Sequence, residues 1–169
     1  PFDATVLPGG GIARTIALDR FVEICATSLS LTAAMLRFAQ AMADQVASSA
    51  ASGLIDPVAL RLARWLLMLH DRSDGDELTL THDLLAEHLG MRRAGVTESL
   101  HVLEGDHVVH CFRGRIMIRD RDALEAAAGT SYGTAETTYR TLIGPFGREH
   151  ETLSHPGRMV SCTASVRAA

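Results

Sequence analysis

Apolar side chains recur at helical spacing along residues 28–51. Leu31, Met35, Phe38 and Met42 are spaced by four, three and four positions, and the polar Gln45 follows three positions later. This heptad-like seam is typical of a helix that pairs with a second copy of itself, and Leu31, Met35, Phe38 and Met42 would then form the dimer interface. A helix packed on its own domain would show the same periodicity, so the pattern alone leaves both interpretations open.

A second helical pattern follows a short segment of small residues. Residues 48–53 (SSAASG) predict the end of the first long helix and a hinge. Asp56 as N-cap and Pro57 in the first turn then predict a helix that continues to His70. We expect this helix to bury the side chains spaced i, i+3, i+4 and i+7, which are Leu62, Trp65, Leu66 and Leu69.

Two further helices are separated by a very short turn. After a polar loop at 71–77 and a short strand at 78–80, Thr81 predicts the cap of a helix that ends before Gly90. Only two residues separate Gly90 from another helical segment, 93–104, whose buried stripe is Val96, Leu100 and Leu103. This arrangement predicts a helix-turn-helix.

A β-hairpin and a short helix complete this unit. The β-prone runs 108–112 and 115–119 meet at Arg113-Gly114, and Asp120 caps a predicted helix over 121–128. Residues 1–17 resemble the end of a β-rich domain and 18–26 a short helix, whereas 129–169 lack a sustained period and predict a poorly ordered tail.

The composition narrows the class of protein. The chain has 169 residues, 47% of them hydrophobic, and a net charge of −4. These values favour one globular domain with appendages over a disordered chain. We find no membrane span and no secretory signal, so the expectation is a soluble, cytoplasmic protein. Cys25, Cys111 and Cys162 are too far apart in sequence to suggest a disulfide framework or a metal clip.

The charge is unevenly distributed along the chain. All 16 basic residues are arginine, and the segment 88–121 holds six of them against four carboxylates, a local charge of +2. Arg113 and Arg115 lie on either side of the hairpin turn, with Arg119 and Arg121 just beyond. The overall acidity therefore does not argue against a nucleic-acid partner.

One face of the predicted helix 93–104 carries side chains suited to the major groove. They are Arg93, Ala94, Thr97, Glu98 and His101. Arg93 can donate two hydrogen bonds to guanine, Glu98 can accept one from a cytosine amino group, and Thr97 can contact a thymine methyl or a phosphate. Arg92 and Arg93 oppose the dipole at this helix N-terminus, a local conflict that often marks function.

Other chemistry has weak support in the sequence. Ser99, His101 and Asp106 do not make a catalytic triad by proximity in sequence, so we expect no enzyme activity. His110 and Cys111 face opposite ways on a strand, and we expect no metal and no cofactor. A winged-helix module that binds only proteins is the main alternative to a DNA-binding domain. The charge on the surface that would face DNA discriminates between these alternatives, and Arg92, Arg93, Arg113 and Arg115 favour nucleic acid.

The segment from Arg61 onward, RLARWLLMLHDRSDGDELTLTHDLLAEHLGMRRAGVTESLHVLEGDHVVHCFRGRIMIRDRDALE, resembles the winged helix-turn-helix domain of Crp/Fnr bacterial transcription regulators. LAEHLGMRRAGVTESL is the most specific part. The resemblance covers residues 58–128, and the long helix also matches that family's dimerisation helix. It implies a fold that is mainly α with a small β component, in which a long dimerisation helix precedes a winged helix-turn-helix.

The resemblance also implies an organisation and a set of partners. The expected parts are a remnant of a β-roll sensor at 1–26, a dimerisation helix and hinge at 27–53, the DNA-binding domain at 54–128 and the tail at 129–169. A homodimer would bind a palindromic operator in double-stranded DNA, with RNA polymerase as a candidate further partner. The expected DNA contacts are Thr81, Arg92, Arg93, Thr97, Glu98, His101, Arg113 and Arg115. Ala94 and Glu98 depart from the cyclic-AMP-responsive members, so their target sequence is not assumed.

Overall fold

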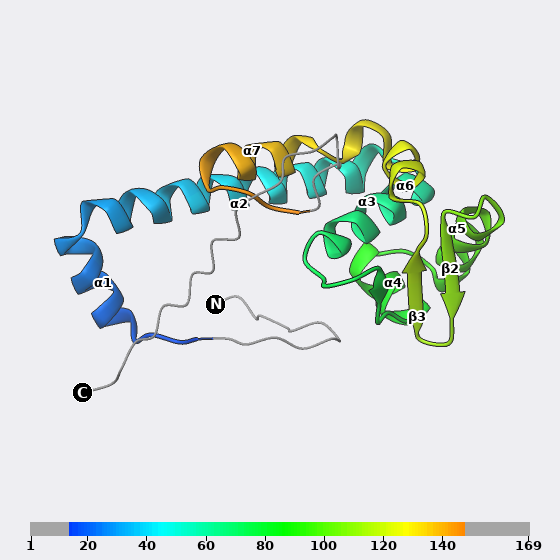
Figure 1. The fold of residues 1–169 in the computed structure, drawn as a ribbon, viewed down its shortest axis with the longest axis horizontal. Helices are drawn as coiled ribbons and strands as arrows, with labels where there is room; N and C mark the ends of the chain where they lie inside the picture. The colour runs from blue at the N-terminus through cyan, green and yellow to red at the C-terminus, as the bar shows by residue number, and fades with distance from the viewer. Residues whose placement is uncertain (1–13, 148–169) are drawn as a thin grey trace, which may run out of the picture.

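The computed structural model describes residues 14–147, which form a mainly helical chain with one small sheet (Figure 1). This confirms the expected fold class. The elements are α1 (Leu18–Thr27), α2 (Leu29–Ile55), α3 (Val58–His70), β1 (Glu77–Leu78), α4 (His82–Leu89), α5 (Arg93–Gly105), β2 (Val109–Phe112), β3 (Arg115–Ile118), α6 (Arg121–Ala128), the 3-10 turn η1 (Gly129–Ser131) and α7 (Thr134–Leu142).

The compact part of the molecule is built from α3 to α6 and the sheet. The strands are antiparallel in the order β1-β3-β2, and β3 pairs Met117 with both Glu77 and His110. The core draws on every helix of this part and on β3, because its fully buried side chains include Leu62, Leu66, Leu85, Leu100, Ile116 and Leu124. Trp65 is only half-buried, at the edge of this core.

The turns form where the sequence places them. The Thr81 hydroxyl caps α4 by accepting a hydrogen bond from the Leu84 amide at 3.2 Å. Gly90 ends that helix in the left-handed conformation, with φ 58° and ψ 42°, which glycine adopts without a steric penalty. Asp120 caps α6 through the Ala123 amide at 2.9 Å. These local signals therefore account for the helix-turn-helix and for the helix that follows the hairpin.

The junction between α2 and α3 differs from the expectation. Residues 48–53 are helical, so the predicted end of the helix at this point is wrong, and α2 continues to Ile55. Asp56 ends α2 and Pro57 is the N-cap of α3, one position later than expected. The small residues at 48–53 interrupt the apolar pattern in the sequence, but the helix continues through them because alanine has the highest helix propensity.

A buried arginine ties this junction together. Arg64 of α3 is 4% exposed; it donates a hydrogen bond to the Ser131 carbonyl at 2.7 Å and another to the Ser49 hydroxyl of α2 at 3.2 Å. The Ser131 hydroxyl in turn donates to the Asp56 carboxylate. Contacts among α2, α3 and η1 thus hold the segment in which a hinge was expected.

Residues 129–147 have a defined structure, so the prediction of a poorly ordered tail is wrong for this part of the chain. Helix α7 lies along α2 (Figure 1) and buries Ala135 and Glu136. The Glu136 carboxylate accepts a hydrogen bond from the Gly133 amide at 2.9 Å, and so supports the start of the helix. The rest of the expected tail, 148–169, lies outside the described residues, as do residues 1–13 of the expected sensor remnant.

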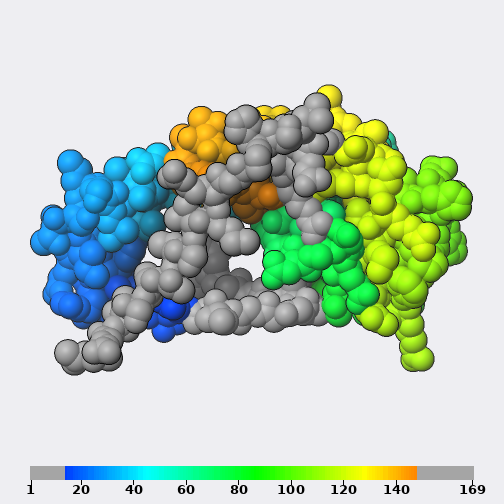
Figure 2. Space-filling view, in the orientation of Figure 1, coloured from blue at the N-terminus to red at the C-terminus, as the bar shows by residue number. Residues whose placement is uncertain are grey.

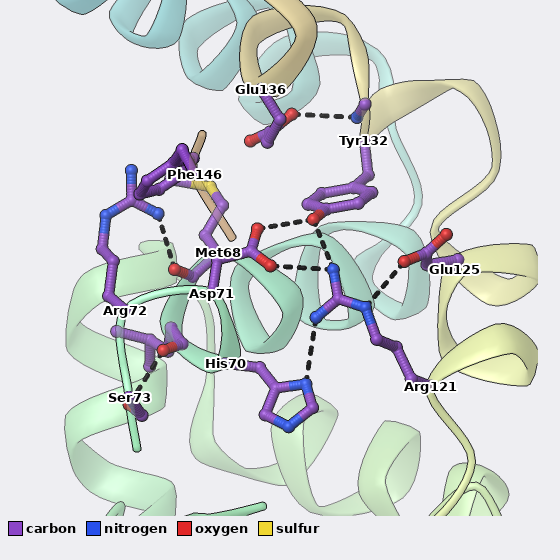
Figure 3. A network of polar contacts seen from close by, with 12 residues as sticks. Met68, His70, Asp71, Arg72, Ser73, Arg121, Glu125, Tyr132, Glu136 and Phe146 are labelled. Carbon is purple, nitrogen blue, oxygen red and sulfur yellow. Dashed lines mark hydrogen bonds and ion pairs between the residues drawn. The ribbon is translucent and has the colours of Figure 1, made fainter. Parts of the chain in front are cut away.

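A buried polar network joins α3, α6 and the segment before α7 (Figure 3). The Asp71 carboxylate accepts hydrogen bonds from Arg121 Nη2 at 2.8 Å and from the Tyr132 hydroxyl. Arg121 Nη1 donates to His70 Nδ1 at 3.1 Å, and because a guanidinium has no acceptor, His70 must carry its proton on Nε2 and donate it to Asp76. Burial is the first cause of the raised pKa of Tyr132, and its bond to Asp71 acts in the same direction.

Between residues 14 and 147, no single helix is long and apolar enough to cross a membrane. Only α1 and α2 taken together reach that length and composition, and they meet at 116°.

Candidate nucleic-acid interface

Helix α5 presents one face of polar side chains away from the core. Its opposite stripe, made of Val96, Leu100 and Leu103, is buried as expected. The outward face forms an open concavity lined by Arg93, Ala94, Thr97, Glu98, His101 and Val102. The five side chains expected on this face therefore lie together, and exposed Val102 is an apolar addition that the sequence interpretation missed.

The N-terminus of α5 collects positive charge. Arg92 is the N-cap residue and makes no capping hydrogen bond through its side chain. Arg92 and Arg93 are both exposed beside the free amides of the first helical turn, where their charge is unfavourable to the helix dipole. An anion at this position would receive both the amides and the guanidinium groups.

The β2–β3 turn carries a second group of cations. Gly114 has φ 76°, which permits the tight hairpin, and Arg113 and Arg115 lie on either side of it, both exposed. Arg115 forms an ion pair with Glu77 of β1 at 3.0 Å, and its guanidinium lies 6.0 Å from the Phe112 ring centre. For Arg92 and Arg113, no ion pair or side-chain hydrogen bond is formed with any residue from 14 to 147.

Arg121 does not belong to this basic surface. Its side chain is paired with buried Asp71, so the sequence-based count of six arginines overstates the exposed charge by one. Arg119 remains exposed beyond β3. The available cations are thus concentrated at the start of α5 and along the hairpin.

Two contacts connect the outward face of α5 to the first turn of α4. Thr97 Oγ1 lies 2.9 Å from His82 Nδ1, within hydrogen-bond distance, and Arg93 Nη1 lies 3.2 Å from Asp83 Oδ1. Neither partner was predicted from the sequence. Each pair joins residues 10 or 15 positions apart on different helices, so no local spacing rule would have found them.

Glu104 fixes the hairpin against α5. Its carboxylate accepts hydrogen bonds from the Cys111 amide at 2.9 Å and from His110 Nδ1 at 2.8 Å. The Cys111 amide is the main cause of the lowered pKa of Glu104, with His110 adding to it. His110 is therefore engaged with a carboxylate, and the position of the hairpin relative to α5 is set by a side chain on α5 itself.

The residues weighed for a metal site or a catalytic triad differ in their surroundings within residues 14–147. Among residues 14–147, no three His, Cys, Asp or Glu side chains are grouped to hold a metal ion. Burial, followed by the charge of Glu104, raises the pKa of Cys111 to about 11, as suits a packed thiol. Ser99 is buried, whereas His101 and Asp106 are exposed, an arrangement unsuited to a nucleophile and its base.

The expected dimer residues lie in the first half of α2 and are partly exposed. Met35, Phe38 and Met42 are each about two-fifths exposed, and Leu31 is half-buried. In the space-filling view, α1 and the first half of α2 lie at the opposite end of the molecule from α5 and the hairpin (Figure 2). This leaves an apolar surface on a helix distant from the basic face.

Comparison with known proteins identifies the domain that carries this face. Residues 60–127 match the Crp-like helix-turn-helix domain. No curated protein shows significant sequence similarity to the chain. The match contains α4, α5 and the hairpin, and therefore the whole of the basic surface.

Solved structures similar to this chain come from bacterial regulators. A CRP-family transcriptional regulator from Thermus thermophilus is 27% identical over 50% of this chain and 47% of its own, with a TM-score of 0.47. The catabolite activator protein of the same organism is 26% identical over 66% and 49%, with a TM-score of 0.40. A Crp/Fnr-family regulator from Eubacterium rectale is 24% identical over 65% and 51%, with a TM-score of 0.51, a likeness of fold. The chain thus spans about half the length of these proteins.

Proposed function

Because residues 60–127 match the Crp-like helix-turn-helix domain, we propose that this chain is a DNA-binding transcription regulator of the Crp/Fnr type. It acts as a homodimer and inserts α5 into the major groove of a palindromic operator. The observation that carries this proposal is the outward face of α5, which gathers Arg93, Thr97, Glu98 and His101, with further exposed arginines at the start of the helix and on the hairpin.

The face is chemically matched to base edges. Arg93 can approach guanine O6 and N7 with two donors, and Glu98 can accept a hydrogen bond from a cytosine amino group. Thr97 offers a methyl group for thymine. Each good bidentate contact discriminates against the wrong base by about 1–3 kcal/mol. Sequence preference would therefore come from few side chains on one helix.

The surrounding cations are suited to the DNA backbone. Arg92 has neither a carboxylate partner nor a hydrogen-bonded side chain between residues 14 and 147, and the same holds for Arg113 on the hairpin. Thr81, at the start of α4, remains exposed and can donate its hydroxyl proton to a phosphate. Contacts of this kind fix the register of a protein on the duplex without reading its sequence.

The apolar seam of α2 favours association of two copies of the chain. Two copies joined through Leu31, Met35, Phe38 and Met42 would cover apolar surface that a single chain leaves in water. Two recognition helices about 34–36 Å apart would then enter successive major grooves on one side of the duplex.

The roles of the two groups of arginines are separable by experiment. Arg93→Ala should weaken binding to a duplex recovered from a random pool and relax preference at one base pair per half-site, by about 1–3 kcal/mol. Arg113→Ala should weaken binding to that duplex and to a shuffled copy equally, with a smaller salt dependence. Fluorescence anisotropy titrations at several salt concentrations measure both effects.

The same titrations test the main alternative. If the unmodified chain binds no duplex, or if its binding does not change with salt, a winged-helix module that contacts only proteins becomes the better interpretation. If both variants lose equal affinity on the two duplexes, the reading role of Arg93 is wrong.

A further inference from the structure

The first turn of α4 contacts two of the side chains that face outward from α5. His82 is the first residue of α4 and Asp83 the second, directly after the cap at Thr81. His82 Nδ1 lies 2.9 Å from the Thr97 hydroxyl, and Asp83 Oδ1 lies 3.2 Å from Arg93 Nη1. His82 and Asp83, adjacent on α4, thus contact Thr97 and Arg93, which lie one turn apart on α5.

The contact between Asp83 and Arg93 contributes little to folding. Their side chains are 67% and 64% exposed, and ion pairs this open to water have only a small effect on stability. The ion pair favours one placement of a long arginine side chain that can otherwise sample many rotamers. Among contacts within residues 14–147 only Nη1 is engaged, which leaves Nη2 and Nε as donors.

This restriction bears on how Arg93 would meet DNA. A mobile arginine at the start of α5 would be drawn to the nearest phosphate, as expected for its neighbour Arg92. A carboxylate beside the guanidinium repels phosphate and keeps the side chain over the groove. Asp83 therefore favours contact with a base edge over contact with the backbone.

His82 restricts Thr97 in a similar way. A hydroxyl that bonds to His82 fixes the side-chain torsion of Thr97 and with it the direction of the methyl group. The methyl group is the part of threonine that recognises thymine. Both contacts from α4 thus act on the orientation of a base-reading group.

We propose that His82 and Asp83 are specificity-determining residues, which position Thr97 and Arg93 for base recognition and keep Arg93 from the DNA backbone. This inference rests on the proposed function, because it concerns how the same face discriminates between sequences. It assigns a role in recognition to a turn that precedes the recognition helix.

Asp83→Asn tests the inference, with Glu87→Gln as its control. Glu87 is an exposed carboxylate one turn further along α4, so its replacement changes the net charge near the DNA by the same amount. We expect Asp83→Asn to reduce discrimination at the base pair that Arg93 reads by about 2- to 5-fold per half-site. Glu87→Gln should leave that discrimination unchanged. Competition titrations with the recovered duplex and its single-base variants measure both.

A double variant establishes whether Asp83 acts through Arg93. In the Arg93→Ala background, Asp83→Asn should have no further effect on discrimination. His82→Ala should reduce discrimination at the base pair contacted by Thr97 by about 2- to 10-fold. His82→Asn should restore it, because its amide can bring a hydrogen-bonding atom to the place of Nδ1.

The outcomes separate this inference from the proposed function. The role of Asp83 is wrong if Asp83→Asn discriminates between sequences as well as the unmodified chain does. It is also wrong if Asp83→Asn still changes discrimination in the Arg93→Ala background. In both cases the proposed function stands. If the unmodified chain shows no discrimination at all, both are wrong. Far-ultraviolet circular dichroism of each variant confirms that the fold is intact.

Discussion

Asp71 is the most deeply buried partner in the described ion pairs, with a side chain that is 0% exposed. It receives the Arg121 guanidinium and the Tyr132 hydroxyl, and so joins α3 to α6 and to the chain that leads into α7 (Figure 3). A buried charge of this kind is costly unless its partners remain in place. The network therefore makes the fold sensitive to the loss of any single member.

Asp71→Ala should lower the free energy of unfolding by about 3–5 kcal/mol, because it leaves Arg121 buried without its main counter-ion. Urea denaturation followed by circular dichroism measures the change. Glu23→Ala is the matched control, since its ion pair with Arg20 is largely exposed and should contribute no more than about 1 kcal/mol. Equal losses in the two variants would contradict a structural role for the network.

Candidate site residues could be predicted where the sequence pattern that places them is local. Arg93, Thr97, Glu98 and His101 share a face because helical spacing dictates it, and the sequence identified them. His82 and Asp83, which contact Thr97 and Arg93, lie on another helix, and only tertiary packing brings them close. Arg121 shows the converse, since its place in the chain suggested a basic surface and packing buried it against Asp71.

Elements were predicted best where caps and glycines mark their ends. Helices α4, α5 and α6 and the β2–β3 hairpin follow from Thr81, Gly90, Gly114 and Asp120. Helix α7 was missed because its buried face includes Glu136, which reads as a solvent-exposed residue when taken alone. Its burial depends on contact with α2, a helix far earlier in the sequence, and no periodicity within 134–142 shows that.

Packing of α7 on α2 gives a prediction at the scale of elements. Ala135 is 4% exposed, so Ala135→Leu should overpack the contact and lower the free energy of unfolding by about 1–3 kcal/mol. Thr137→Leu, at an exposed position of the same helix, should change it by less than about 0.5 kcal/mol. Thermal or urea denaturation compares them, and an unaffected Ala135→Leu variant would argue against α7 as a packed element.

The molecule as a whole separates two surfaces of different character. The exposed arginines at the start of α5 and on the hairpin lie at one end, and the apolar seam of α2 lies toward the other (Figure 2). The net charge of −4 therefore describes neither surface. An acidic body with a small basic face predicts modest affinity for arbitrary DNA, with specificity carried by a few contacts and by pairing of two copies.

Phe38→Glu tests the pairing. A charge placed in the middle of the seam should give monomers in sedimentation velocity runs at concentrations at which the unmodified chain dimerises, because it would be buried without a partner. Ala47→Glu adds the same charge at an exposed position of α2 outside the seam and should leave the dimer intact. An unchanged mass for Phe38→Glu would reject the seam as the interface.

Selection of bound sites from random duplex DNA tests the central claim most directly, because it presupposes neither the operator nor its spacing. Recognition by two copies of α5 predicts enrichment of a palindrome whose half-sites lie one helical turn apart, about 10–10.5 base pairs from centre to centre. The enrichment should be lost for Arg93→Ala at one base pair of each half-site. Recovery of no common sequence, or of single half-sites without symmetry, would contradict a dimer that reads DNA through α5.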